Sequence, residues 1–124
     1  MKALLLIGCG SFAGGVLRYG VSRLLQGAPW LSLPWGTYCV NILGCLLLGL
    51  CYGVSERYQV FSEEMRLLFI VGFCGSFTTF STFIHENFLL MRQSDVLGFV
   101  VYVSLSVASG LLAVYAGHGL VKIG

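Results

Sequence analysis

Four long apolar stretches fill most of this sequence, and they limit its fold more than any other feature. They extend approximately over residues 3–25, 33–55, 65–91 and 96–120. A helix needs roughly 20 mostly apolar residues to cross the hydrocarbon core of a bilayer, and each stretch meets that length. The sequence therefore predicts an all-α integral membrane protein with four transmembrane helices, organised as a single transmembrane domain over residues 1–124.

The composition supports this prediction. Hydrophobic residues make up 57% of the chain and charged residues only 10%, whereas soluble proteins contain about 45 to 50% apolar and about 25% charged residues. The net charge of +2 is small and scattered along the chain, so no nucleic-acid partner is expected. We predict a multi-pass protein of the cell inner (plasma) membrane, surrounded by the lipid bilayer.

Five cysteines lie within the apolar stretches, and none of them forms a C-x-x-C pair. They are Cys9, Cys39, Cys45, Cys51 and Cys74. Their odd number and their membrane setting argue against a disulfide framework. We expect them to behave as small buried apolar side chains.

The basic residues are divided almost equally between the two sides of the predicted bundle. One side has Lys2, Arg57, Arg66 and Lys122, and the other has Arg18, Arg23 and Arg92. An excess of Lys and Arg normally marks the cytoplasmic side, and here the excess is a single residue. A chain without a clear bias can insert both ways, and two opposed copies can pair about an axis in the membrane plane. The sequence thus suggests an antiparallel homodimer.

Residues 72–83 interrupt the third stretch near its middle with the sequence GFCGSFTTFSTF. Two glycines and a cluster of hydroxyl residues, which compete for backbone hydrogen bonds, disfavour a continuous helix. At membrane depth, non-helical backbone is stable only where protein or a polar cavity shields it. The third helix is therefore predicted to break near residues 75–79, and the break is the first candidate for a functional site.

Such a break frees backbone carbonyls at the end of one half-helix and N–H groups at the start of the next. The partial negative charge of free carbonyls suits a hard cation such as sodium. Ser76, Thr78 or Thr79 could cap the downstream half-helix. If the two-fold axis of the dimer passes through the break, each free carbonyl is present twice. Two carbonyls per chain would then make a cage of four oxygens.

Helical spacing groups the side chains beyond the break into lines. Phe80 and Phe83 share one line, and they either pack as ordinary aromatics or present the positive edges of their rings to a small anion. Hydroxyl stripes commonly hold membrane helices together, but two of them beside an interrupted helix favour a permeation path. The polar lines are Thr79, Thr82 and Glu86 in the third stretch and Tyr102, Ser106 and Ser109 in the fourth.

Three segments resemble the Fluc (CrcB) fluoride ion channels, and the resemblance extends over essentially the whole chain. The segments are residues 14–19 (GGVLRY), 36–44 (GTYCVNILG) and 72–83 (GFCGSFTTFSTF). The third segment is the most specific of them, because it is long and combines threonine, serine and phenylalanine in an unusual run.

The resemblance implies an antiparallel dual-topology homodimer with two fluoride pores and one structural sodium ion on the axis. The backbone carbonyls of Gly75 and Thr78 would hold that sodium ion. The pore would contain an aromatic box of Phe80 and Phe83, a hydrogen-bond donor in Asn41, and a polar track with Ser81, Thr82 and Tyr102. Ser106 joins the track by its spacing from Tyr102 alone.

Two charged residues within the predicted spans need separate interpretation. Arg18 matches the family's arginine near the end of the first helix, where it either lends positive potential to a vestibule or anchors the helix at the interface. Glu86 has the wrong sign to attract an anion, so it is given no role in selectivity.

The function expected from this resemblance is a passive channel that lets fluoride leave the cytoplasm and so relieves fluoride toxicity. No enzyme activity is expected, because His85 and His118 have neither a nucleophile nor a metal partner within reach by spacing. The alternative is a small dual-topology, proton-coupled multidrug exporter. That chemistry needs a carboxylate in the first helix, and no Asp or Glu precedes Glu56. A non-transporting assembly factor would leave the interrupted helix unexplained.

Overall fold

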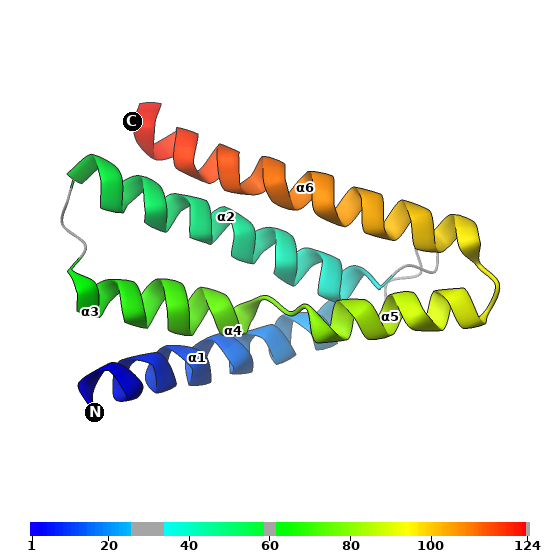
Figure 1. Cartoon of the computed structure of the whole chain (residues 1–124), viewed down its shortest axis with the longest axis horizontal. Helices are drawn as coiled ribbons and strands as arrows, with labels where there is room; N and C mark the ends of the chain where they lie inside the picture. The colour runs from blue at the N-terminus through cyan, green and yellow to red at the C-terminus, as the bar shows by residue number, and fades with distance from the viewer. Residues whose placement is uncertain (26–33, 59–61, 124) are drawn as a thin grey trace.

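The structure is a computed structural model, and it describes residues 1–25, 34–58 and 62–123. Within these residues, four helices are long and apolar enough to cross a membrane. Three of them are single helices: α1 (Lys2–Leu25), α2 (Trp35–Tyr58) and α6 (Val96–Ile123). Figure 1 shows them lying lengthwise beside a composite third span. The four predicted spans are thus present, and the predicted start of the second at residue 33 lies outside the described residues.

The third span is assembled from shorter pieces. In chain order they are α3 (Glu63–Met65), the π-helix η1 (Arg66–Cys74), α4 (Gly75–Phe77) and α5 (Ser81–Arg92). It begins with a side-chain cap, because the Ser62 side chain accepts a hydrogen bond from the Met65 backbone N–H at 3.2 Å. Glu63 and Glu64 follow in the first turn, where negative charge is favourable.

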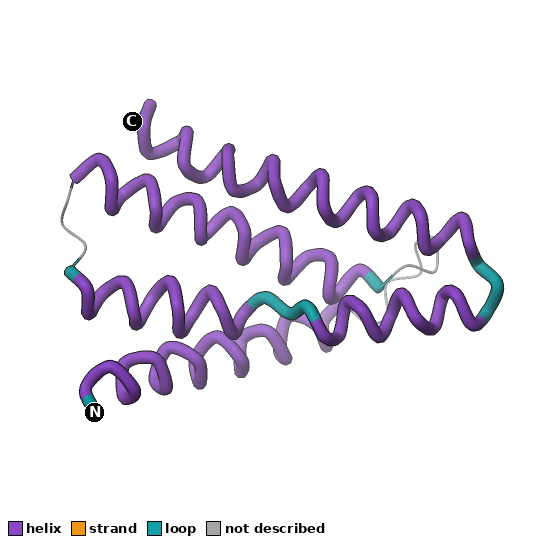
Figure 2. Tube along the Cα trace, viewed as in Figure 1, coloured by secondary structure: helices purple, strands orange, loops and turns teal. Residues whose placement is uncertain are grey.

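The helical path of the third span stops between Phe77 and Ser81, as Figure 2 shows. Gly75 keeps right-handed helical torsions, and the first extended residue is Thr78, with φ −84° and ψ 159°. The break therefore occupies residues 78–80, which overlap the end of the predicted 75–79 range and extend one residue beyond it. The predicted range began too early because Gly75 remains helical. The helix is interrupted at the hydroxyl residues that follow Phe77.

Two helix pairs form the body of the bundle. Helix α1 packs on η1 and α4, while α2 packs mainly along α6. Glycines permit the close approach in both pairs. A Cβ atom at Gly14 would collide with the Phe73 carbonyl and lie 3.1 Å from the Phe77 nitrogen, and one at Gly49 would collide with the Val114 carbonyl. These two positions therefore fix how near the helices lie.

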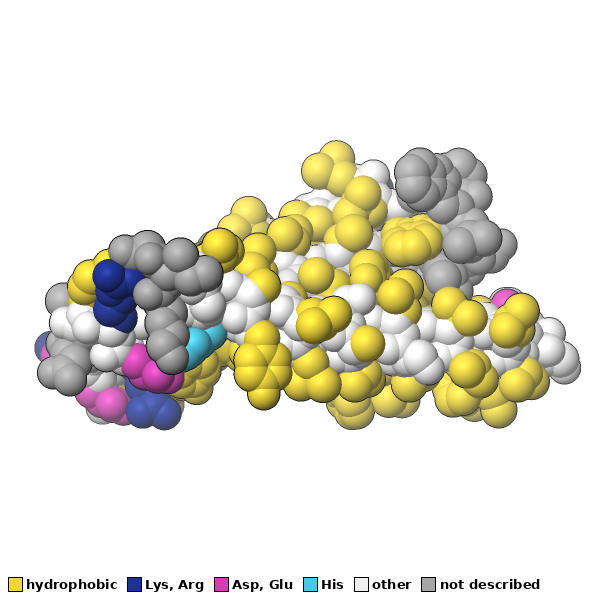
Figure 3. Space-filling model, turned by 90° about the horizontal axis from the view of Figure 1, so that it is seen from above, with side chains coloured by type: hydrophobic (Ala, Val, Ile, Leu, Met, Phe, Trp, Pro, Cys, Tyr) yellow, Lys and Arg dark blue, Asp and Glu magenta, His cyan; other side chains and the backbone are white. Residues whose placement is uncertain are grey.

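The outer surface is apolar along the helices. Large side chains such as Phe12, Leu112 and Tyr115 are more than two-thirds exposed. Figure 3 shows this apolar face, and most of the charged side chains visible on it lie at one end. At that end Lys2 forms an ion pair with Glu64 at 2.8 Å. The distribution is that of a multi-pass membrane protein whose helix ends meet the headgroups.

Candidate functional site

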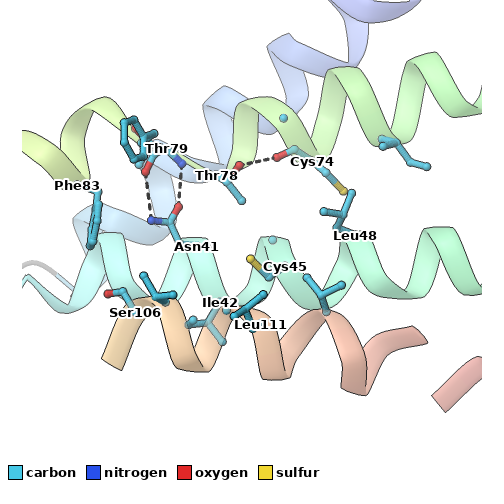
Figure 4. Close-up of a pocket in the computed structure, with 17 residues that line it drawn as sticks. Asn41, Ile42, Cys45, Leu48, Cys74, Thr78, Thr79, Phe83, Ser106 and Leu111 are labelled. Carbon is cyan, nitrogen blue, oxygen red and sulfur yellow. Dashed lines mark hydrogen bonds between the residues drawn. The ribbon is translucent and has the colours of Figure 1, made fainter. Parts of the chain in front are cut away.

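The break in the third span is held by side chains from two other helices. Asn41, on α2, pairs with both backbone groups of Thr79: its Nδ2 donates to the Thr79 carbonyl at 3.1 Å, and its Oδ1 accepts from the Thr79 N–H at 2.8 Å. Figure 4 shows these two bonds side by side. Asn41 thereby satisfies backbone groups that a continuous helix would have paired internally.

The other side of the break is tied to α1. The Nε of Arg18 donates to the Ser76 carbonyl at 3.2 Å, so a positive charge lies at the carbonyl end of the first half-helix, where it is favourable. Thr78 closes the same half-helix, because its backbone N–H and its hydroxyl both donate to the Cys74 carbonyl, at 3.2 and 3.0 Å.

Two further carbonyls of the break have no donor. Within the part of the chain that the structure describes, the carbonyls of Gly75 and Thr78 accept no hydrogen bond. In a continuous helix, the Thr79 N–H would donate to the Gly75 carbonyl, but here it donates to Asn41. These are the two residues whose carbonyls were expected to bind sodium, and both lack a protein partner.

A cavity of about 480 Å³ lies next to the break, between α2, the third span and α6. Several residues singled out from the sequence line it together: Asn41, Gly75, Thr78, Thr79, Phe80, Phe83 and Ser106. Among the residues that the structure describes, the buried hydroxyl oxygen of Ser106 has no hydrogen-bond partner. The cavity thus combines apolar walls with a few uncommitted polar groups, an arrangement typical of ligand sites.

An aromatic row leads out of this cavity. The Phe80 and Phe83 rings are 6.4 Å apart, and the Phe83 and Tyr102 rings are 5.0 Å apart. Tyr102 is almost completely buried at 1% exposure, whereas Phe80 is 74% exposed. Both ring pairs are tilted, so each pair brings ring edges, which carry partial positive charge, toward its neighbour.

A second cavity of about 410 Å³ lies toward the end of α1, and Glu86 in its wall accepts a hydrogen bond from Tyr102. Its walls include Arg18, Arg23, Thr37, Thr82 and Glu86. The two arginines outnumber the one acid, so the cavity carries a net positive charge. Arg18 thus lines this cavity, and its guanidinium also holds the break.

Glu86 has a structural role that the sequence analysis missed. Its two carboxylate oxygens accept hydrogen bonds from Thr37 at 2.8 Å and from Tyr102 at 2.9 Å. The carboxylate therefore connects α5 to α2 and to α6. One signal was available in the sequence: Thr37 lies four residues before Asn41, on the same face of a helix.

The remaining expected residues are placed differently. Ser81 is exposed at the start of α5 and borders neither cavity. Ser109 accepts a hydrogen bond from the Tyr38 hydroxyl at 2.7 Å, so it is engaged away from Ser106. Residues Asn41, Phe80, Phe83 and Ser106 are brought together at one cavity and Arg18 and Thr82 at the other, with Tyr102 between them.

Comparison with known sequences identifies the family. Residues 5–118 match the family described as CrcB-like protein, Camphor Resistance (CrcB). The chain belongs to the CrcB family. Among the curated CrcB-family relatives, the fluoride-specific ion channel FluC of Leptospira interrogans is 39% identical over 121 residues, covering 98% of this chain and 95% of the relative.

Two further relatives of the same family agree in length as well as in sequence. The fluoride-specific ion channel FluC of Phocaeicola vulgatus is 41% identical over 94% of this chain and 96% of its own. The fluoride-specific ion channel FluC 1 of Methanosarcina acetivorans is 42% identical over 94% of this chain and 88% of its own. The similarity therefore includes all four spans and the break.

Proposed function

We propose that this CrcB-family protein is a fluoride-selective ion channel through which fluoride leaves the cytoplasm down its electrochemical gradient. Fluoride enters a cell as neutral HF and dissociates inside, so a path for the anion relieves toxicity. The names of the relatives support the substrate. The single observation in the structure that carries the proposal is the row Phe80–Phe83–Tyr102, in which the two phenylalanines line one cavity and Tyr102 is hydrogen-bonded to Glu86 in the wall of the other.

This row has the properties that anion conduction needs. A small anion that leaves water requires stabilisation, but a strong binding site would trap it. Ring edges and neutral hydroxyls provide weak stabilisation without a buried cation. The Ser106 hydroxyl has no protein partner, and Asn41 Nδ2 uses one of its two hydrogens on Thr79. Both groups are thus able to donate to an anion beside Phe83.

The entrance of the proposed path is the cavity at Arg18. Its two arginines attract fluoride, and Thr82 lines the same cavity. While Glu86 accepts from both Thr37 and Tyr102, these two hydroxyls cannot donate to an anion. Fluoride must therefore pass along the ring edges, or Glu86 must release a hydroxyl.

The proposal includes an antiparallel homodimer with two pores. Phe80 is 74% exposed although it lies at mid-span, and a second copy packed there would cover it. The nearly equal division of basic residues supports opposed insertion of the two copies. In the dimer, the edge of each Phe80 ring would then face the partner chain.

A structural sodium ion on the dimer axis completes the proposal. The unpaired carbonyls of Gly75 and Thr78 fit this ion, because sodium is a hard cation that prefers oxygen ligands. Within the described residues, no group of three or more His, Cys, Asp or Glu side chains could hold a metal ion, so the backbone would supply the ligands. When bound, the ion would cancel the partial negative charge of the free carbonyls.

Fluoride efflux from proteoliposomes, measured with an ion-selective electrode beside chloride efflux, tests the function. The proposal predicts passive fluoride efflux that needs no proton gradient, with chloride efflux near the leak of empty liposomes. Equal efflux of both ions would contradict selectivity. Efflux that requires an opposed proton gradient would favour an exporter instead.

A further inference from the structure

The cavity of about 410 Å³ at the end of α1 is far larger than a fluoride ion. Its walls come from the last turns of α1, the first turn of α2 and one face of α5. In Figure 1 the end of α1 and the start of α2 lie away from the two chain termini. A water molecule occupies roughly 30 Å³, and fluoride is of similar size. The cavity therefore has room for a larger anion.

The two arginines of this cavity are not paired with acids. Arg18 donates through Nε to the Ser76 carbonyl, and Arg23 lies over the Tyr19 ring, with its guanidinium carbon 5.9 Å from the ring centre. Among the described residues neither arginine forms an ion pair, and residues 26–33 and 59–61 contain no Asp or Glu. Glu86 accepts hydrogen bonds from two hydroxyl groups instead. The terminal amino groups of both guanidinium groups are thus available to a ligand.

The polar groups of the cavity suit a phosphate that carries one negative charge. Guanidinium groups match the spacing of phosphate oxygens and bind them through paired N–H donors. The hydroxyls of Tyr19 and Ser22 also line the cavity, and within the part of the chain that the structure describes they have no hydrogen-bond partner. Two guanidinium charges and one carboxylate charge leave a net charge of +1. A phosphodiester balances this charge, whereas inorganic phosphate, with a charge of about −1.5 to −2 at pH 7, exceeds it.

The surroundings of the arginines suit the apolar part of a lipid. Phe12, Val16, Tyr19 and Arg23 lie on one face of α1 by helical spacing. The first three side chains are 76%, 55% and 63% exposed, so an apolar stripe leads along α1 to the cavity. Trp35 lines the cavity from α2, and aromatic residues of this kind lie at headgroup depth. A phosphate at the arginines would therefore continue into acyl chains along this stripe.

We propose that Arg18 and Arg23 bind the phosphate of an anionic phospholipid, with phosphatidylglycerol as its simplest probe. Basic pockets between transmembrane helices bind anionic headgroups in this way. The bound lipid connects the end of α1 to the start of α2 and stabilises this end of the bundle. Lipid binding does not require fluoride conduction, so either property can fail without the other.

Native mass spectrometry of the purified full-length protein, stripped of lipid and mixed with dioleoylphosphatidylglycerol, tests the site. Wild type is expected to retain a single lipid molecule per chain. Arg23→Gln should weaken retention about tenfold or more, because one charge-assisted contact is lost. Arg92→Gln is the matched control: Arg92 also lies over an aromatic ring four residues earlier, that of Phe88, but it borders neither cavity. Equal retention by Arg23→Gln and Arg92→Gln would overturn the proposal.

Two further ligands, measured on wild type alone, identify the source of the phosphate. Dioleoylphosphatidylcholine has the same acyl chains and phosphate but no net charge, and it should be lost under conditions that retain phosphatidylglycerol. An excess of inorganic phosphate should leave the retained phosphatidylglycerol in place. Equal retention of the two lipids, or displacement of phosphatidylglycerol by inorganic phosphate, would contradict an anionic-lipid site.

Discussion

The side-chain amide of Asn41 and the backbone of Thr79 form a reciprocal pair of hydrogen bonds, at 3.1 and 2.8 Å. The amide side chain on α2 thus supplies the donor and the acceptor that a neighbouring β-strand would supply to a single extended residue. Because Thr79 is satisfied from outside, the carbonyl of Gly75 loses its helical partner and stays free. The break is therefore a consequence of tertiary contact as well as of local sequence.

Asn41→Leu should destabilise the protein by roughly 2 to 4 kcal/mol, because two hydrogen bonds are lost and two backbone groups lose their partners. Asn87→Leu is the matched control. Within the described ranges, Asn87 bonds only to the Phe83 carbonyl of its own helix and its buried Oδ1 has no partner, so its replacement should be nearly neutral. Detergent-induced unfolding measures both. Equal stability of the two variants would contradict the role of Asn41.

Arg18→Gln should lower both stability and the rate of fluoride efflux. The substitution removes a charge-assisted bond to the Ser76 carbonyl, worth about 1.5 to 3 kcal/mol in general, and reduces the positive charge of the entrance cavity. Arg92→Gln serves as control, because Arg92 is exposed, lies over the Phe88 ring and lines neither cavity. Unfolding and efflux assays on both variants would refute this account if Arg92→Gln had the larger effect.

Tyr102→Phe should cost about 1.5 to 3 kcal/mol, because it leaves one oxygen of the Glu86 carboxylate without its donor. The same substitution should cost clearly less in a Glu86→Gln background, where no charge remains to be solvated. A double-mutant cycle measured by unfolding gives the coupling between the two residues. Additive effects would mean that the Tyr102–Glu86 contact contributes little to the packing of α5 on α6.

Gly49→Ala should destabilise the pair of α2 and α6 by about 1 to 3 kcal/mol, because overpacking forces the backbones apart. Gly119→Ala is its control, since a Cβ there meets nothing within 4 Å, and alanine favours helix over glycine. We expect the control to be as stable as wild type or slightly more so. If an unfolding assay found Gly119→Ala less stable than Gly49→Ala, the result would be incompatible with close packing at Gly49.

The coarse fold could be predicted because each span carries its own signal. Twenty or more apolar residues identify a transmembrane helix without knowledge of its neighbours. The break was detectable from its hydroxyl cluster. Its position depended on Asn41, however, which is distant in the sequence and shifts the interruption to residues 78–80.

Helical spacing could predict which side chains of one helix lie together. It could not predict hydrogen bonds between side chains of different helices. Phe80 and Phe83 follow from helical spacing, and they do line one cavity. By contrast, the hydrogen bonds that join Thr37 and Tyr102 to Glu86 cross three helices, and helix rotation cannot be read from apolar runs that are hydrophobic all round. The hydrogen bond that Ser109 accepts from Tyr38 could not be predicted either. It engages Ser109 away from the polar line expected with Tyr102 and Ser106.

Fluoride efflux by Phe83→Ile, compared with Phe88→Ile, tests the central claim most directly. Phe88 lies on the same helix but is 54% exposed and lines neither cavity, so its replacement removes an equal ring outside the proposed path. The account predicts that Phe83→Ile, like Phe80→Ile, abolishes or greatly slows fluoride efflux from proteoliposomes while the protein remains folded, and that Phe88→Ile conducts as wild type does. Undiminished efflux through folded Phe80→Ile and Phe83→Ile variants would contradict it.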